Sequence, residues 1–302
     1  MKNQSFAKGV FFAVSGFLIW GILPLYWRLM DGIQPFHLLG FRIFLSFLLL
    51  ATVLSVQKNF VWVTVFRDYR KGILIVIASL ILCINWGVYL WAVSEGRIIE
   101  ASLGYYINPL LSVVLGLIFF KEKLTRIQWT AFALACLGVL MLTLFSGTFP
   151  WISIVLAFCF AFYGFIKKKL SLSSLESLTA ESLVAAPLGL ALLLVYSNSG
   201  GGFSVGLGGI SYIASFGTGI LFALSVSGAV SSLPLYCFGN GAKMLPLSTL
   251  GFFQFISPTM KFFLGIFVFQ EVFPAHHFIA FAFIWFAAVL HIISLKRQSR
   301  AQ

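Results

Sequence analysis

The sequence predicts an all-α integral membrane protein with ten transmembrane helices, arranged as two inverted five-helix repeats. Composition is the first reason: 60% of the 302 residues are hydrophobic and 9% are charged, whereas a soluble globular protein carries about 25% charged residues. The second reason is that long apolar runs follow one another with short connections. The third is a pattern of proline, glycine and glutamate that occurs once in each half of the chain.

The apolar runs have the length of membrane spans. A bilayer core of about 30 Å needs about 20 apolar residues in a helix. The first run is too long for the apolar segment of a secretory signal peptide, and no small-residue cleavage site follows it, so we expect it to be a true span. No run of residues is left for a soluble domain. The expected spans are residues 8–28, 36–56, 72–93, 101–120, 127–146, 149–167, 178–197, 214–238, 246–270 and 276–295.

Basic residues alternate between the two sides of these spans. Of the 20 lysines and arginines, sixteen fall on one side, Arg28 and Arg97 on the other, and Arg42 and Lys261 inside spans. Because cytoplasmic loops of membrane proteins are enriched in Lys and Arg, both termini are expected in the cytoplasm. The net charge of +12 is then next to anionic lipid head groups. No basic, aromatic-rich domain is present to bind nucleic acid.

The two halves share one sequence frame. The segment NPLLSVVLGLIFFKE ends at Glu122, and SPTMKFFLGIFVFQE ends at Glu271. When residues 109–143 are shifted by 149 positions onto 258–292, eight of the 35 positions are identical. We therefore expect repeats at 1–146 and 147–302 that together form one membrane domain. Five spans is an odd number, so the second repeat enters the membrane upside down, an arrangement typical of secondary transporters.

Several longer motifs resemble one known family. They are NWGVYLWAV (85–93), EASLGYYINPLLSVVLG (100–116), KEKLTRIQW (121–129), AFYGFIKKKL (161–170), PLYCF (234–238), LSTLGFFQFISPT (247–259) and FAFIW (281–285). The chain resembles the RarD proteins of the EamA branch of the drug/metabolite transporter (DMT) superfamily. This resemblance implies the EamA/DMT fold, a permease function and a cavity lined by spans 1, 3, 4, 6, 8 and 9. Most members of the family are exporters of small metabolites or drugs, and some related carriers import or exchange.

Lys261 is the strongest candidate for a substrate-binding residue. It lies about 15 Å along the helix from Glu271 at a rise of about 1.5 Å per residue, hence near the middle of the membrane. Insertion of a lysine there costs about 2.5–3.5 kcal/mol, so it should face the protein interior. A buried ion pair without substrate contact is the structural alternative. Helical spacing puts it on one stripe with Gln254, Pro258 and Gly265.

The remaining candidates fall into three groups. Tyr105, Pro109, Ser112 and Gly116 form the equivalent stripe of span 4, where each proline should break the backbone pattern and each glycine should allow close packing. The other expected cavity residues are polar or aromatic: Tyr106, Asn108, Asn85, Trp86, Trp20 and Tyr236. Arg42, Glu181 and Glu100 are candidate gating charges; Arg42 would pair with Asp31 or Glu100, and Glu181 with Lys167–Lys169. Glu122 and Glu271 have loop or capping roles as alternatives to transport.

These features predict a transporter rather than an enzyme. The sequence has no Walker A motif, so ATP is not expected to be the direct energy source. It also has no recognisable catalytic constellation, metal site or cofactor motif. The expected partners are a small-molecule substrate and membrane lipids; a coupling proton and a homodimer are left open. The balance of Lys261 and Arg42 against Glu181 favours a substrate with a carboxylate, although a cationic drug could bind aromatic faces instead. A membrane enzyme and a non-transporting sensor or scaffold are the competing classes.

Overall fold

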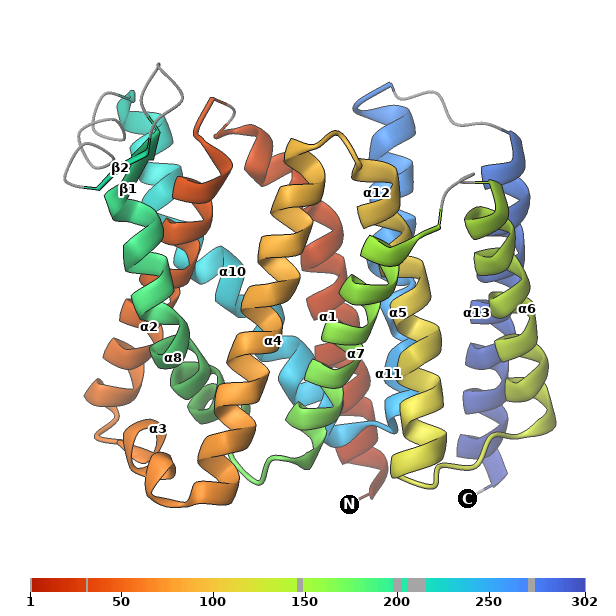
Figure 1. The fold of residues 1–302 in the computed structure, drawn as a ribbon. Helices are drawn as coiled ribbons and strands as arrows, with labels where there is room; N and C mark the ends of the chain where they lie inside the picture. The colour runs from red at the N-terminus through yellow and green to blue at the C-terminus, as the bar shows by residue number, and fades with distance from the viewer. Residues whose placement is uncertain are drawn as a thin grey trace. The chain divides into compact units, whose positions relative to one another are not determined.

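A computed structural model describes residues 2–30, 32–145, 149–197, 203–205, 216–270 and 275–301. It confirms the predicted fold class, because ten helical segments are long and apolar enough to cross a membrane (Figure 1). The helices of these segments are α1 (Lys2–Arg28), α2 (Pro35–Val56), α4 (Tyr69–Ser94), α5 (Ile98–Phe119), α6 (Arg126–Phe145), α7 (Trp151–Lys169), α8 (Ser174–Leu194), α10 (Thr218–Met244), α11 (Leu247–Gln254), α12 (Ile256–Phe267) and α13 (Ala275–Ala301).

Several helix boundaries differ from those of the expected spans. The seventh span begins and ends earlier than expected, at α8, and Val195–Ser197 instead form strand β1, which pairs antiparallel with β2 (Phe203–Val205). Valine and tyrosine favour extended backbone over helix. The described part of α10 extends beyond the expected end, to Met244. The loop after α2 holds the short helix α3 (Val61–Thr64) and the 3-10 turn η1 (Val65–Arg67).

The two repeated prolines have different effects on the backbone. The ninth span is divided into α11 and α12, with Phe255 between them. Pro258, in the first turn of α12, has no N–H to donate to the carbonyl of Gln254, which ends α11. Pro109, in contrast, lies inside the continuous helix α5. The break expected at Pro109 is therefore wrong; a proline in a membrane helix is tolerated where neighbouring groups satisfy the backbone.

The chain divides into two compact units. Unit 1 comprises residues 1–22, 84–169 and 237–302, and unit 2 comprises 23–83 and 170–236. Each unit contains segments from both of the expected repeats.

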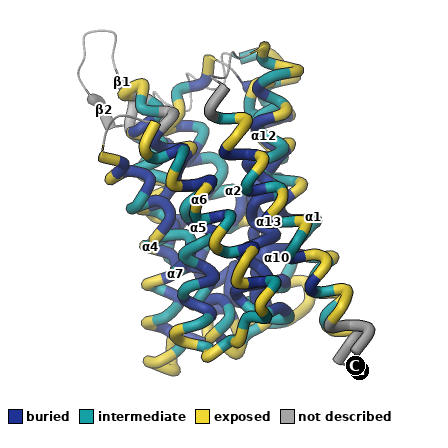
Figure 2. The backbone as a smooth tube through the Cα atoms, turned by 90° about the vertical axis from the view of Figure 1, so that its right-hand side faces the viewer, coloured by how far each residue is buried: buried dark blue, intermediate teal, exposed yellow. Residues whose placement is uncertain are grey.

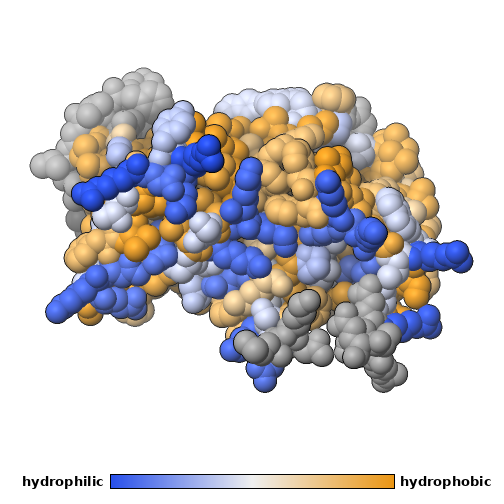
Figure 3. Space-filling view, turned by 90° about the horizontal axis from the view of Figure 1, so that it is seen from below, coloured by the Kyte–Doolittle hydropathy of each residue, from blue (hydrophilic) through white to orange (hydrophobic). Residues whose placement is uncertain are grey.

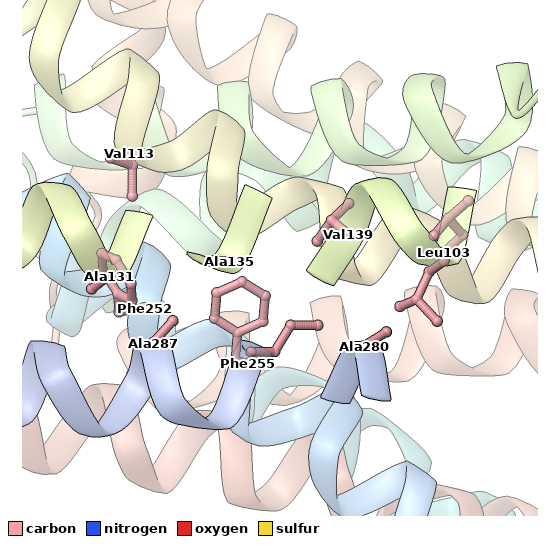
Figure 4. Packing of buried hydrophobic residues seen from close by; sticks show 11 residues of the cluster. Leu103, Val113, Ala131, Ala135, Val139, Phe252, Phe255, Ala280 and Ala287 are labelled. Carbon is pink, nitrogen blue, oxygen red and sulfur yellow. The ribbon is translucent and has the colours of Figure 1, made fainter. Parts of the chain in front are cut away.

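Unit 1 has a core built on the contact between α6 and α13, which lie side by side in Figure 1. Small residues allow this close contact: an added Cβ on Gly138 would lie 2.7 Å from the carbonyl oxygen of Ala280. Bulkier side chains from α5, α11 and the α11–α12 junction fill the adjoining space, as Figure 4 shows. The buried cluster consists of Leu103, Val113, Ala131, Ala135, Val139, Leu142, Phe252, Phe255, Ala280, Ile284 and Ala287.

Unit 2 is held together by the pair α2 and α8 and by contacts of α10. An added Cβ on Gly40 would lie 2.9 Å from the carbonyl oxygen of Gly189, so the two helices cross at a pair of glycines. The hydroxyl of Ser46 donates to the carbonyl of Gly228 on α10 at 3.0 Å. Close backbone approach and interhelical hydrogen bonds of this kind are typical of helices packed in lipid.

The surface combines apolar helix faces with hydrophilic ends. Buried and exposed residues alternate along the helices in Figure 2, and the exposed ones include large apolar side chains such as Phe11 and Phe222. Figure 3 shows hydrophilic side chains gathered on the face seen from below. Within unit 1, both termini, the loop between α5 and α6, and the C-terminal end of α7 lie at that lower end in Figure 1. The basic clusters of unit 1 therefore share one end.

The glycine contact between α6 and α13 generates a stability prediction. Gly138→Ala should lower the thermal unfolding midpoint of the purified protein, because overpacking costs about 1–3 kcal/mol. Gly87→Ala on α4 is the matched control, since a Cβ there meets nothing within 4 Å and alanine is the better helix former. Equal stabilisation by both substitutions would contradict the packing described here.

Candidate functional site

The candidate site lies in unit 1, where α5 meets α11 and α12 along a line of polar contacts. We call this line the polar seam; its residues are Tyr105, Pro109, Ser112 and Gly116 of α5, and Ser248, Gly251, Gln254, Pro258 and Lys261 of α11 and α12. The backbones approach closely, because an added Cβ on Gly251 would lie 2.7 Å from the carbonyl oxygen of Pro109. The seam brings together both stripes that the sequence predicted, with Gly265 buried further along α12.

Lys261 meets an aromatic ring rather than a carboxylate. Its Nζ lies 4.3 Å from the centroid of the Tyr105 ring, and the Tyr105 ring lies edge-on to Tyr89, with 6.0 Å between centroids. All three side chains are partly exposed. Within the described part of the chain, Lys261 makes no ion pair. The alternative of a buried structural ion pair is therefore not supported among these residues.

The second contact of the seam mirrors the first. Gln254 Nε2 donates to Ser112 Oγ at 3.1 Å. In the 149-residue frame Gln254 corresponds to Tyr105, and Ser112 corresponds to Lys261. The pair Tyr105–Lys261 and the pair Gln254–Ser112 are therefore exchanged by the repeat frame. The chemistry differs between them, because one pair carries a positive charge and the other is neutral.

Tyr106 also joins α5 to α12. Its hydroxyl donates to the carbonyl of Pro258 at 3.3 Å, and its ring lies edge-on to Phe281 at 5.3 Å between centroids. The sequence placed Tyr106 in the cavity lining. The structure gives it contacts with α12 and α13, and its place in a cavity lining stays a prediction.

The two asparagines behave differently. Asn85 Nδ2 donates to the carbonyl of Leu156 on α7 at 3.0 Å. This hydrogen bond links α4 to α7. Asn108 is 5% exposed, and its Oδ1 has no donor among the described residues. The Oε1 of Gln254, in a side chain that is 4% exposed, also lacks one. Two buried acceptors in this part of unit 1 thus remain available to a water or ligand.

The other aromatic residues predicted to line the cavity are divided between the two units. Trp20 packs against Phe160 of α7 and Phe238 of α10, with centroids 5.4 and 5.8 Å apart. Trp86 is partly buried on α4 in unit 1. Tyr236 is partly buried on α10 and belongs to unit 2, so its position relative to Lys261 stays a prediction.

Two contacts of Arg42 lie within unit 2. Its Nε donates to Ser231 Oγ at 3.0 Å, and its guanidinium lies 4.3 Å from the ring centroid of Trp27. Asp31 lies outside the described residues. Glu100 forms a bidentate pair with Arg97, at 2.8 and 2.9 Å. Arg97 is the N-cap residue of α5 and precedes Glu100 by three positions, a spacing at which side chains on a helix meet. The pairing of Arg42 with Asp31 or Glu100 stays a prediction, since Glu100 belongs to unit 1 and Arg42 to unit 2.

Glu181 is buried, and its backbone carbonyl accepts a hydrogen bond from Ser79 Oγ at 2.8 Å. Glu181 lies in unit 2 and Lys167–Lys169 lie in unit 1, so their pairing stays a prediction.

Glu122 has a role that the sequence only outlined. Its carboxylate accepts hydrogen bonds from Leu247 N at 2.7 Å and from Ser248 N at 2.9 Å, and so caps the start of α11. The sequence offered capping as one alternative for Glu122, but no pattern identified α11 as the helix to be capped. Its counterpart Glu271 lies outside the described residues.

Comparison with known proteins agrees with this architecture. The model of the EamA-like transporter family matches residues 7–144. The chain is 38% identical to a protein named Uncharacterized transporter YojE from Bacillus subtilis, over 100% of this chain and 99% of the relative. It is 37% identical to Protein RarD of Streptomyces exfoliatus, over 97% and 92%, and 33% identical to Protein RarD of Escherichia coli, over 97% and 96%.

A solved crystal structure extends the agreement to the fold. It superposes with a TM-score of 0.71 at 16% sequence identity and covers 99% of both chains. Identity of 33–37% over 97% of the chain to proteins named RarD shows the family. The ten apolar helical segments among the described residues are those of a multi-pass membrane protein. The chain belongs to the EamA-like transporter family, as a permease of the RarD type.

Proposed function

We propose that this protein is a secondary transporter that moves a small amphipathic metabolite or drug bearing a carboxylate across the cytoplasmic membrane. Transport proceeds by alternating access, as export or exchange, and the energy comes from a substrate gradient, from exchange or from protons. The observation that carries this proposal is Lys261, placed inside a span against the ring of Tyr105.

The energy of the ammonium group favours a charged ligand. A lysine at the centre of a membrane helix costs about 2.5–3.5 kcal/mol. A cation–π contact returns about 0.5–2 kcal/mol, so Tyr105 alone does not offset the cost. A carboxylate in contact with Lys261 would supply the rest. The partly exposed rings of Tyr105 and Tyr89 would meet the apolar part of the same molecule.

Alternating access is supported by the two exchanged contacts of the polar seam. Helices related by an inverted repeat can adopt two mirrored arrangements about a central site. The exchange of Tyr105–Lys261 with Gln254–Ser112 is what such a relation between α5 and α11–α12 would produce. A cationic or neutral drug, or uptake rather than export, is the alternative on the same fold. A non-transporting sensor is the alternative of a different class.

Flux through reconstituted protein tests the role of Lys261. Lys261→Gln should reduce the uptake of carboxylate-bearing solutes into liposomes by about 10–100-fold, because a hydrogen bond to a charged group is worth about 1.5–3 kcal/mol. Neutral and cationic solutes should change by less than about threefold. Lys169→Gln removes the same charge from an exposed position at the end of α7 and should leave flux unchanged. An equal loss for all three classes of solute would refute an anionic substrate.

Removal of the Lys261 charge should increase the thermal stability of the protein although it decreases flux. Lys261→Met keeps the length of the side chain and removes the charge, so it should raise the thermal unfolding midpoint of the ligand-free protein while it reduces carboxylate transport. Functional sites commonly lower stability in this way. A lower midpoint for Lys261→Met, measured next to Lys169→Met, would show that the lysine is structural.

The topology of the proposal places both termini in the cytoplasm. In unit 1 both termini share an end with basic clusters, which is the cytoplasmic end by the positive-inside rule. In sealed inner-membrane vesicles of known orientation, cysteines placed at Lys8 and Lys296 should react with an impermeant thiol reagent only from the cytoplasmic face. A cysteine at Glu95 should react only from the other face. The reverse pattern would invert the proposed orientation.

A further inference from the structure

The start of α11 is held by a side chain from another part of unit 1. Pro246, which precedes the helix, provides no side-chain cap. Glu122, from the loop between α5 and α6, accepts hydrogen bonds from the first two backbone N–H groups of α11. It also accepts one from Ser248 Oγ at 2.6 Å. One carboxylate thus accepts three hydrogen bonds at a helix N-terminus. Such a charge-assisted contact is stronger than a neutral one.

A lysine completes this junction from a third segment. Lys168, at the end of α7, donates to the carbonyl of Leu245 and lies 3.9 Å from Glu122 Oε1. The side chains of Glu122 and Lys168 are 12% and 18% exposed. The junction therefore joins three segments at the basic end of unit 1 (Figure 1) and is within reach of water.

Gly116 makes room for this carboxylate. An added Cβ on Gly116 would lie 2.6 Å from Glu122 Oε2 and 3.0 Å from Ser248 N. The backbone N–H of Glu122 also donates to the carbonyl of Gly116 at 3.1 Å. The glycine and glutamate of the repeated sequence frame thus act together in one contact.

The junction lies at one end of the polar seam. Along α11 and α12, the successive contacts with α5 are Ser248 beside Gly116, Gly251 beside Pro109, Gln254 on Ser112 and Lys261 on Tyr105. Helix α11 cannot move away from α5 at its N-terminal end while Glu122 holds it. Release of this one carboxylate would free the end of the seam that leads to Lys261.

We propose that Glu122 and Lys168 form a latch that closes the basic end of the polar seam and releases α11 once in each transport cycle. This inference rests on the proposed transport function. The contacts are suited to repeated breaking, because both side chains are partly exposed and water can replace the hydrogen bonds that the carboxylate accepts. Glu122 and Lys168 are thus positioning residues that act on Lys261 through α11.

Thiol accessibility tests the latch. The four free cysteines, Cys83, Cys136, Cys159 and Cys237, are replaced by alanine, and Ser112→Cys, at a position 1% exposed, reports opening of the seam. In oriented vesicles, Glu122→Gln should speed its modification by an impermeant thiol reagent about tenfold from the basic end, with no change from the other end. Gly116→Ala, which displaces the carboxylate, should have the same effect, and Gly87→Ala should have none.

A second reporter separates opening from general loosening. Ser153→Cys on α7 is fully buried and contacts the backbone of Glu100 at the opposite end of unit 1, so a latch variant should leave its reactivity unchanged. Equal acceleration at Ser112→Cys and Ser153→Cys would overturn the latch, and so would no acceleration at Ser112→Cys in both Glu122→Gln and Gly116→Ala. If Glu122→Gln does not fold, Ser248→Ala, which loses one hydrogen bond, should give about a threefold acceleration, and no acceleration overturns the latch.

Flux measured on the same vesicles keeps the two proposals apart. Latch-dependent accessibility without flux of any solute would contradict the transport function and leave a gated seam in place. Flux that persists in the wild type while accessibility is independent of Glu122 would overturn the latch and leave the transport function intact.

Discussion

A polar group inside a bilayer must find its partner within the protein, because the hydrocarbon core offers none. This constraint is most severe for the ammonium group of Lys261. In unit 1 the polar seam provides the partner. Helix α5 carries Tyr105, and helix packing places the centroid of its ring 4.3 Å from Lys261 Nζ. The close approach of Gly251 to Pro109 brings the two helices near enough for these contacts to form.

The seam also links the site to the end of the membrane domain. Helix α5 carries both Tyr105 and Gly116, and the ninth span carries Lys261 on α12 and Ser248 on α11. Gly116 and Ser248 meet at Glu122. Lys261 and the N-terminus capped by Glu122 therefore lie on two successive helices of one span, α12 and α11, which meet at Phe255. In the repeat frame the two sides of the seam share the positions of a proline and a glycine and differ in charge, because Ser112 stands where the other copy has Lys261.

Sequence alone predicted the helices well, because their length and apolarity are set by the thickness of the bilayer. It also singled out Lys261 as a candidate, since a charge in an apolar run is conspicuous, and the role of Lys261 in binding stays a prediction. Periodicity could not show that the span breaks at Phe255 while α5 continues through Pro109, because satisfaction of the freed carbonyls depends on neighbouring helices. The pairing of Glu100 with Arg97 and the capping of α11 by Glu122 were missed for the same reason: partners are chosen by tertiary packing.

The central claim is that Lys261 and Tyr105 act as one unit on the substrate. A double-mutant cycle on carboxylate flux into liposomes tests it most directly, with Tyr105→Leu, Lys261→Met and both changes together. If the residues form one site, the double variant should lose about as much flux as the more damaging single variant, which is a large coupling energy. Losses that simply add in free energy would contradict the account.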